Sequence, residues 1–417
     1  MLMYFSTYLI VRTFHLEYFF MKEYIQEKYR NYKHRRETSS FKMAFYDSIS
    51  MIPKSQWDFS SKNIYLSHSY LESIELSHSD SVDFRYVLFS LEGKLVAKAC
   101  FQLVDLKFIN SISDSGSNRK KTLLKLLKKD TGVRILICGN AFANGEHGFE
   151  YLNSMNKEDA FNVLATGVYR LRRSDKINGQ ISLVMLKDFW PESEKEVIQL
   201  KKFDYRPFEI EPNMVINLNK DWKSIDDYLK SVTSKYRNKA KSVFKKSKSL
   251  EVKNLEANEL GFYHLRLDEL FNNVYSKAGF KLIKFETKSF VRLKKRLGDR
   301  LVVKGYFKGD LLVGFAFSLL NDDVLDFNYV GIDYSYNKVY ALYQRMMYDQ
   351  ISMAIQNSCL RLQLGRTATE IKSSLGAVPY GMKVLVRHRN TLNNKLIKPL
   401  VKSISVPEVD IRDPFKK

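Results

Sequence analysis

The segment from Cys359 to Ala377, CLRLQLGRTATEIKSSLGA, contains the transition on which the interpretation of the whole chain depends. Apolar and polar residues alternate up to Gly365 and Arg366, which is typical of a half-buried β-strand. A short helical segment carrying Glu370 and Lys372 follows and closes on a glycine. The arrangement is either an ordinary corner between a strand and a helix, or a polar cluster at the mouth of a sheet where a substrate binds.

The same order of elements occurs twice along the chain, and this segment belongs to the second copy. A strand hairpin over 84–104 has its counterpart over 300–320, where Leu311 aligns with Leu95 without a gap. A further strand, a long helix, another strand, a short helix and a final strand follow each hairpin. This repeated alternation predicts an α/β (α+β) chain with two units, each a mixed sheet flanked by helices.

Apolar periodicity predicts the long helices over 157–176 in the first copy and over 338–358 in the second. The extra residues 109–132 of the first copy look like a polar loop and a basic helix. Between the copies, the spacing over 221–252 predicts an amphipathic helix. Its polar side carries Lys235, Arg237, Lys239, Lys241, Lys245, Lys246 and Lys248.

The composition favours a globular chain with an anionic partner. The 417 residues are 45% hydrophobic and carry a net charge of +22. This charge suits nucleic acid, acidic lipid headgroups or a phosphate-bearing cofactor, unless the lysines only solvate the surface. Cys100, Cys138 and Cys359 show neither metal-ligand spacing nor a disulfide framework, so we expect no metal site and a cytoplasmic protein.

We predict four segments: a leader over 1–40, domains over 41–218 and 219–396, and a tail over 397–417. Charges interrupt the apolar N-terminus, which is followed by a basic run. It is an interfacial amphipathic segment, a weak signal anchor or a stretch upstream of the true start. We expect a non-globular leader.

The doubled order of elements, the basic SKYRNKAKS helix (234–242) and LGRTATEIKSSLGAVPYG (364–381) resemble the FemAB-like, BioF2-like group of GNAT acyltransferases. The tail RDPFKK (412–417) also resembles a bacterial branch of this group, of the peptidoglycan-biosynthesis or cell-envelope type. The resemblance covers 41–389. It implies two tandem GNAT-like acyl-CoA N-acyltransferase domains, and transfer of an acyl group from acyl-CoA or acyl carrier protein to an amine.

In a GNAT fold two central parallel strands splay apart around the donor, and the resemblance places this pair at 325–331 and 360–366. The residues predicted to be catalytic are Tyr329 as an acid, Asp326 or Glu370 as the base, and Arg366 as the group that holds a carboxylate or phosphate. We expect the substrate to contact Asn328, Thr367, Lys372, Glu146 and His147, with Lys372 binding an anion. The alternative for each is a surface salt bridge or a helix cap, Thr367 being the cap.

The phosphate loop departs from the usual GNAT pattern. In the second copy the connection over 331–341 has one glycine, and in the first copy Gly139, Gly145 and Gly148 are the candidates for binding the cofactor. Their spacing misses the coenzyme A motif, so another activated acyl donor is an alternative. In the same loop His147 is either solvated or a base poised near neutral pH.

Two other functions stay open from the sequence. One is tRNA-dependent aminoacyl transfer to a peptidoglycan precursor, and the other is a degenerate, non-catalytic binding module. The expected partners are a small-molecule or lipid-linked amine, and tRNA or an anionic membrane surface contacted by the 235–248 helix. We expect no stable protein partner, and a cytoplasmic location that includes the inner face of the membrane.

Overall fold

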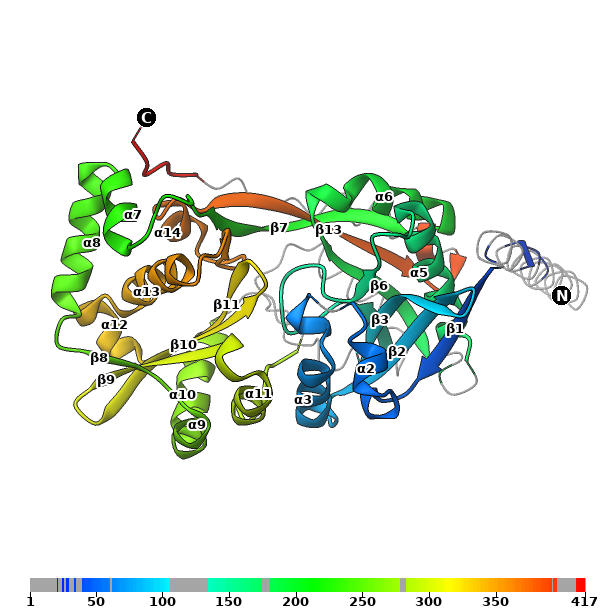
Figure 1. Cartoon of the computed structure of the whole chain (residues 1–417), viewed down its shortest axis with the longest axis horizontal. Coiled ribbons are helices and arrows are strands. Elements are labelled where there is room, and N and C mark those ends of the chain that lie inside the picture. The colour runs from blue at the N-terminus through cyan, green and yellow to red at the C-terminus, as the bar shows by residue number, and fades with distance from the viewer. Residues whose placement is uncertain are drawn as a thin grey trace, which may run out of the picture.

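The structure is a computed structural model (Figure 1). It describes residues 40–60, 62–105, 134–174, 177, 180–277, 283–391, 393–395 and 410–416, together with Met21, Ile25, Lys28, Tyr29 and His34. The predicted insert at 109–132 and most of the predicted leader lie outside the described residues. His34 is buried, and its Nδ1 lies 3.0 Å from Thr166 Oγ1.

The described strands form one mixed sheet of 13 strands, in the order β1-β2-β3-β4-β6-β13-β7-β12-β11-β10-β9-β8, with β5 paired to β3. Those of the first half are β1 (Phe41–Tyr46), β2 (Val82–Leu91), β3 (Lys94–Asp105), β4 (Arg134–Cys138), β5 (Phe149–Tyr151), β6 (Ile181–Phe189) and β7 (Arg206–Asn217). Those of the second are β8 (Glu251–Asn254), β9 (Leu301–Lys308), β10 (Leu311–Asn321), β11 (Val324–Ile332), β12 (Arg361–Gln363) and β13 (Val378–His388). The predicted α/β class with mixed strand pairing is confirmed, but the described strands form one continuous sheet and not a separate sheet in each unit.

The two halves exchange their last strands. β7 ends the first half but pairs with β12 of the second, whereas β13 ends the second half and pairs with β6 of the first. β7 and β13 also pair with each other, and Figure 1 shows them as the long strands that run between the halves. The predicted domain boundary at 218 stays a prediction, and the hydrogen bonding of the sheet crosses it.

Helices cover both faces of the sheet. Their bounds are α2 (Lys54–Trp57), α3 (His68–His78), α5 (Lys157–Arg172), α6 (Glu194–Ile198), α7 (Ile225–Ser231), α8 (Ser234–Lys246), α9 (Ala257–Phe262), α10 (His264–Tyr275), α11 (Ser289–Leu297), α12 (Tyr334–Tyr340), α13 (Leu342–Gln356) and α14 (Thr369–Ser373). α5 is capped as its sequence predicts: Asn156 accepts from Glu158 N, and arginines occupy the last turn.

Two predicted helices are each divided in the structure. The helix expected over 338–358 breaks at Ala341, whose φ of 50° is left-handed and separates α12 from α13. The basic helix expected over 221–252 is α7 followed by α8, with Val232 between them in an extended conformation. Both breaks interrupt the i to i−4 hydrogen bonding without a proline or glycine to signal them.

A shared core joins the halves on one face of the sheet. It combines residues of α3 and β2 from the first half, such as Tyr70 and Tyr86, with Leu270, Phe290 and Phe317 from α10, α11 and β10 of the second. Three further cores are present among the described residues: one around α5, one around α13, and a smaller one formed by β3, β4, β6 and β13. The first two also include residues of the exchanged strands, Leu385 of β13 and Met214 of β7. The first and second halves therefore bury apolar surface against each other, which fixes the residues where they meet.

Candidate active site

The central parallel strands of the second half separate after a short pairing. β11 pairs with β12 only over Val324–Asp326 and Arg361–Gln363, and β11 then continues to Ile332 without β12. Beyond this point β11 pairs with β10 as its one strand partner among the described residues, and Asn273 Nδ2 donates to Ile332 O at 3.2 Å. Backbone N–H and C=O groups that lack a strand partner are strong hydrogen-bonding groups, so the separation can receive an extended ligand.

Asp326 is the last residue of β11 that pairs with β12, and its carboxyl group is buried. Burial raises its pKa from 3.8 to about 7, although hydrogen bonds from Tyr65 and Asn321 oppose the shift. Its Oδ2 has no hydrogen-bond partner among the described residues. Asn328, two residues along β11, donates to Tyr65 Oη at 2.8 Å. Tyr65, a residue of the first half, therefore hydrogen-bonds to both Asp326 and Asn328.

Lys372 lies on α14, which follows β12, and is 2% exposed. Burial lowers the pKa of its amine from 10.5 to about 7. In the described part of the chain no ion pair or hydrogen bond involves Nζ. The position that a Cβ on Gly365 would occupy lies 3.8 Å from Lys372 Nζ and 3.6 Å from Asn144 Nδ2, so this glycine leaves the space between the two groups open.

Two buried amides continue the polar row from Asp326 across the sheet. Gln363 is the register partner of Asp326, and Asn213 on β7 donates to Gln363 Oε1 at 2.8 Å. Asn213 Oδ1 is buried and has no hydrogen-bond partner among the residues described. Unpartnered buried polar atoms are costly and infrequent in folded proteins. Their concentration here indicates a place where a polar ligand binds.

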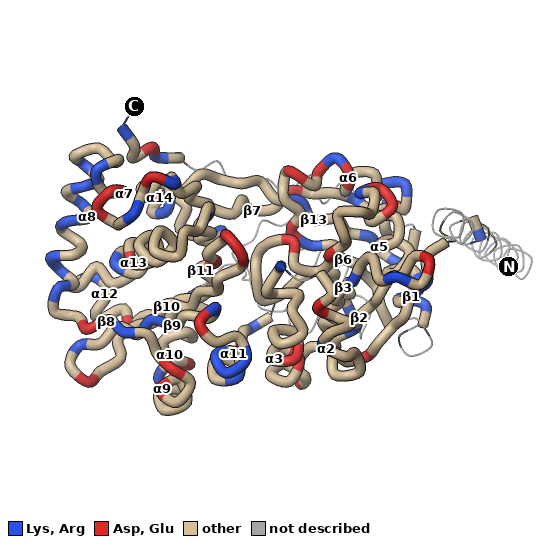
Figure 2. The backbone as a smooth tube through the Cα atoms, in the orientation of Figure 1, with Lys and Arg blue, Asp and Glu red and all other residues tan. Residues whose placement is uncertain are grey.

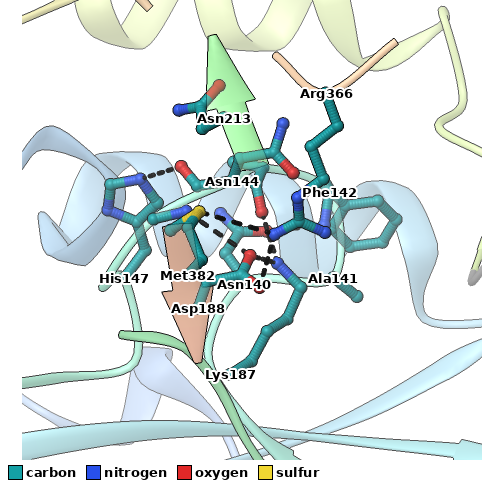
Figure 3. Close-up of polar contacts among 12 residues, drawn as sticks. Asn140, Ala141, Phe142, Asn144, His147, Lys187, Asp188, Asn213, Arg366 and Met382 are labelled. Carbon is teal, nitrogen blue, oxygen red and sulfur yellow. Dashed lines mark hydrogen bonds and ion pairs between the residues drawn. The ribbon is translucent and has the colours of Figure 1, made fainter. Parts of the chain in front are cut away.

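Arg366 pairs with a buried carboxylate of the other half (Figure 3). Its Nη2 lies 2.5 Å from Asp188 Oδ1 at the end of β6, and Lys187 Nζ contacts Asp188 Oδ2. Burial raises the pKa of Asp188, but the two cations together hold it below its ordinary value. Burial and Arg366 lower the pKa of Lys187 to about 8, against the effect of Asp188. Arg366 is therefore fixed across the junction of the halves.

The loop 140–148 of the first half connects Tyr329 to this ion cluster. Tyr329 donates its hydroxyl proton to the carbonyl of Phe142, and burial raises its pKa well above 10. Lys187 Nζ donates to Ala143 O at 2.7 Å. The structure thus brings Tyr329 and Arg366 to the same loop, where both hydroxyl and guanidinium are already partnered by protein groups.

Of the two polar residues predicted in this loop, His147 is buried and Glu146 is half-buried. His147 is 5% exposed, and burial and Lys187 lower its pKa to about 3, so the ring is neutral and neither solvated nor poised near pH 7. Its Nε2 lies 2.8 Å from Asn144 O. Glu146 accepts from Trp190 N at 2.6 Å, and burial raises its pKa to about 7. Both side chains hold the loop in place.

The predicted cofactor glycines pack within the protein. A Cβ on Gly148 would lie 2.1 Å from Gly139 N, and a Cβ on Gly139 would lie 2.8 Å from Lys187 Cβ. Gly145 has a φ of 120° and its N–H lies 3.4 Å from Asp188 Oδ2. Close approach to the backbone of Gly139 accounts for Gly148, whereas positive φ and a neighbouring side chain account for Gly139 and Gly145.

Two predicted site residues lie away from this cluster. Glu370 is exposed on α14 and forms an ion pair with Arg412 of the C-terminal segment. Thr367 is exposed and does not cap α14, because the N-cap residue is Ala368. Glu370 therefore contacts the C-terminal segment, and Thr367 points to solvent.

Sequence reasoning missed five residues of the site: Tyr65, Lys187, Asp188, Asn213 and Gln363. The pair Lys187-Asp188 had a readable signal, since two opposite charges stand inside the apolar run ISLVMLKDF. Buried charges in a strand need partners. Tyr65 and Asn213 carried no such signal, because nothing in the local sequence places them near β11 and β12.

No group of three or more His, Cys, Asp and Glu side chains in the described ranges is arranged to hold a metal ion. Within the same ranges, no helix has both the length and the apolar character needed to span a membrane.

No known protein-family profile matches the chain, and no curated protein matches it. Among solved structures, FemX is 10% identical, with a TM-score of 0.55 over 86% of this chain and 100% of FemX. The tandem GNAT protein from the clavulanic acid biosynthesis pathway is 6% identical, with a TM-score of 0.47 over 84% and 99% of the two chains. The chain therefore shares its fold with FemX, in agreement with the FemAB-like GNAT resemblance of its sequence.

Proposed function

We propose that the protein is an N-acyltransferase that moves an acyl group from an activated donor to an amine. One observation carries the proposal: where β11 and β12 separate, the buried Asp326 carboxyl group has an oxygen without a hydrogen-bond partner among the described residues, and the buried Lys372 amine lies beside Gly365, just after β12. Burial brings the pKa of both groups to about 7. Environments that move a carboxyl pKa up and an amine pKa down are typical of acid–base sites. The FemX-like fold is consistent with this reaction.

Each of the two groups has a role in the transfer. The amine nitrogen of the acceptor attacks the acyl carbonyl carbon, forming the C–N bond and breaking the bond to the leaving group. Asp326 takes the proton that the nitrogen loses, and its free Oδ2 is the accepting atom. Lys372 as an ammonium stabilises the oxyanion and returns a proton to the leaving group. The net change is amide formation with release of the protonated leaving group.

The helix N-termini do not fit the pyrophosphate of coenzyme A. At α12 the carboxylate of Asp333 caps the helix, accepting from Ser335 N at 3.1 Å, and is ion-paired with Arg266. At α5 the first turn carries Glu158 and Asp159. Carboxylates at these positions repel a second anion. The proposal therefore extends to activated donors other than acyl-CoA.

A second candidate is aminoacyl transfer from tRNA, and α8 favours it. Figure 2 shows this helix as a basic edge of the second half. Its sequence from Ser234 to Lys246 contains no acidic residue, and in the described residues its lysines form no ion pair. Its apolar residues, among them Ala240 and Val243, are buried against the second-half core. All charged residues on the remaining face are cationic, which suits a phosphate backbone.

A panel of donors tests both candidates. Acyl-CoA, acyl carrier protein thioester and aminoacyl-tRNA are each incubated with amine acceptors, and the products are measured by mass. We expect one donor class to give an amide product, and Asp326→Asn and Lys372→Met to slow its formation at least ~100-fold. Replacing Lys241 and Lys245 by serine should weaken only a tRNA-dependent reaction. No product with any donor would refute the transferase proposal.

A further inference from the structure

The C-terminal segment returns to the second half and lies against the junction of α7 and α8. Phe415 forms an antiparallel bridge with Val232, and Thr233 N donates to Pro414 O at 2.9 Å. Pro414 is buried, although residues 410–416 are otherwise mostly exposed. The segment is thus held by its backbone and by a few side chains.

Phe415 places its ring against the end of α14. The ring stacks on Trp222, with centroids 5.9 Å apart, and lies edge-on to Tyr228 at 6.3 Å. A Cβ on Gly376 would lie 2.3 Å from Phe415 Cε2. Gly376 has a φ of 85°, so both its conformation and the ring above it require glycine.

Gly376 in turn closes the helix that carries Lys372. Gly376 N donates to Ser373 O at 2.9 Å, and the next residue, Ala377, donates to Lys372 O at 3.1 Å. At the other end of α14, Glu370 is ion-paired with Arg412 of the same C-terminal segment. α14 has five residues, too few for a helix to persist without tertiary contacts.

We propose that the C-terminal segment 410–416 is a strap that positions α14, and with it the amine of Lys372. Phe415 and Arg412 are positioning residues that act through the two ends of this helix. The inference rests on the proposed function only for the catalytic role of Lys372. The docking of the strap and its effect on Lys372 are measurable without any transfer reaction.

Loss of the strap should expose Lys372 to water. A lysine with a pKa of about 7 is half neutral at pH 7, whereas an ordinary lysine is neutral in fewer than about 1 in 1,000 molecules. A strap that only stabilises the fold would change the melting temperature and leave the titration of this one amine where it is. The titration therefore separates positioning from general stabilisation.

The experiment compares the full chain with a chain that ends at residue 409, with and without a synthetic peptide of residues 410–417. Hydrogen exchange of residues 369–377 reports on α14, and the pH midpoint of Lys372 modification, followed by mass spectrometry, reports on its pKa. We expect truncation to raise exchange in this segment at least about tenfold and to move the midpoint up by more than one pH unit. The peptide should reverse both changes.

Two altered peptides serve as matched probes. Phe415→Ala should fail to restore protection, and Lys416→Ala should succeed, because this lysine is exposed and contacts the chain through its backbone N–H. Should the truncated chain not fold, the full-length Phe415→Ala and Lys416→Ala variants are compared by the same two measurements. Unchanged exchange and an unchanged midpoint in the truncated or Phe415→Ala chain would overturn the proposal. Neither measurement depends on acyl transfer, so both test the strap even if the proposed function is wrong.

Discussion

Asp188 is the residue on which the junction of the two halves depends most. It is fully buried, it adopts a left-handed φ of 64°, and it pairs with Lys187 and Arg366. Asp188→Asn leaves the buried Lys187 and the half-buried Arg366 without their shared counter-charge. We expect it to lower the free energy of unfolding by about 3–5 kcal/mol, measured by urea denaturation.

A double-mutant cycle isolates this interaction from general effects of the substitution. Arg366→Gln combined with Asp188→Asn should cost less than the sum of the single changes, because each removes a charge that the other leaves unpaired. Asp83, which pairs with Arg134 on a more exposed edge of the sheet, provides a control, and Asp83→Asn should cost less than about 1 kcal/mol. If the losses of unfolding free energy from the two single changes simply added, Asp188 and Arg366 would not interact, which would contradict the ion cluster.

The buried Lys372 side chain should lower the free energy of unfolding at the pH values where its amine is charged. Its folded pKa of about 7 lies below the ordinary 10.5, so its favourable contribution is present above about pH 10.5 and is lost as pH falls through 7. Lys372→Met should therefore raise the free energy of unfolding by about 1–3 kcal/mol below pH 7, and by less at higher pH. Urea unfolding at several pH values measures this, with exposed Lys416→Met as the control. A variant less stable than the wild type at every pH would contradict it.

At the scale of elements, α14 is held by contacts outside itself, and Gly376 offers a direct test. Gly376→Ala places a methyl group in the Phe415 ring, whereas at Gly309, also at positive φ, a Cβ would have open space. We expect Gly376→Ala to cost about 1–3 kcal/mol more than Gly309→Ala. In a Phe415→Ala background the two costs should become similar. If Gly376→Ala still cost more than Gly309→Ala in the Phe415→Ala background, the clash would not be with Phe415.

The sequence predicted most of the elements, because alternation and helical periodicity follow directly from which face is buried. It did not predict the break at Ala341, since apolar residues continue at helical spacing from α12 into α13 and alanine is a good helix former. At this turn Tyr343 N donates to Asn337 Oδ1 at 2.9 Å. Val232, which separates α7 from α8, forms a bridge with a distant partner, Phe415, which the local sequence does not indicate.

At the scale of the whole molecule, the exchanged strands make each half depend on the other. Residues 41–218 alone would leave β6 without β13, and residues 219–417 alone would leave β12 without β7. We expect neither piece to unfold cooperatively by itself, and the two together to form a stable complex when co-expressed. Circular dichroism melting and size-exclusion chromatography measure this. A cooperative transition in an isolated half would contradict the exchange.

The candidate site shows where sequence reasoning stops. Asp326 and Arg366 were identified on the two strands that the GNAT resemblance implies to separate, and Lys372 on the short helix that follows the second of them. Their partners Tyr65 and Asp188 come from the other half, and the same alternation in β7 and β13 is compatible with pairing inside a half or between halves. Which residues meet at the junction is therefore a property of the assembled sheet.

The pH dependence of amide formation tests the central claim most directly, once the donor panel has identified a donor. The rate is measured for the wild type, Asp326→Asn and Lys372→Met. We predict that the wild-type rate is highest at about pH 7 and that each variant is slower by at least ~100-fold. Asp326→Asn should lose the fall in rate on the acidic side of the maximum, and Lys372→Met should lose the fall on the basic side. A rate that both variants retain, or a profile without inflection near pH 7, would contradict the account.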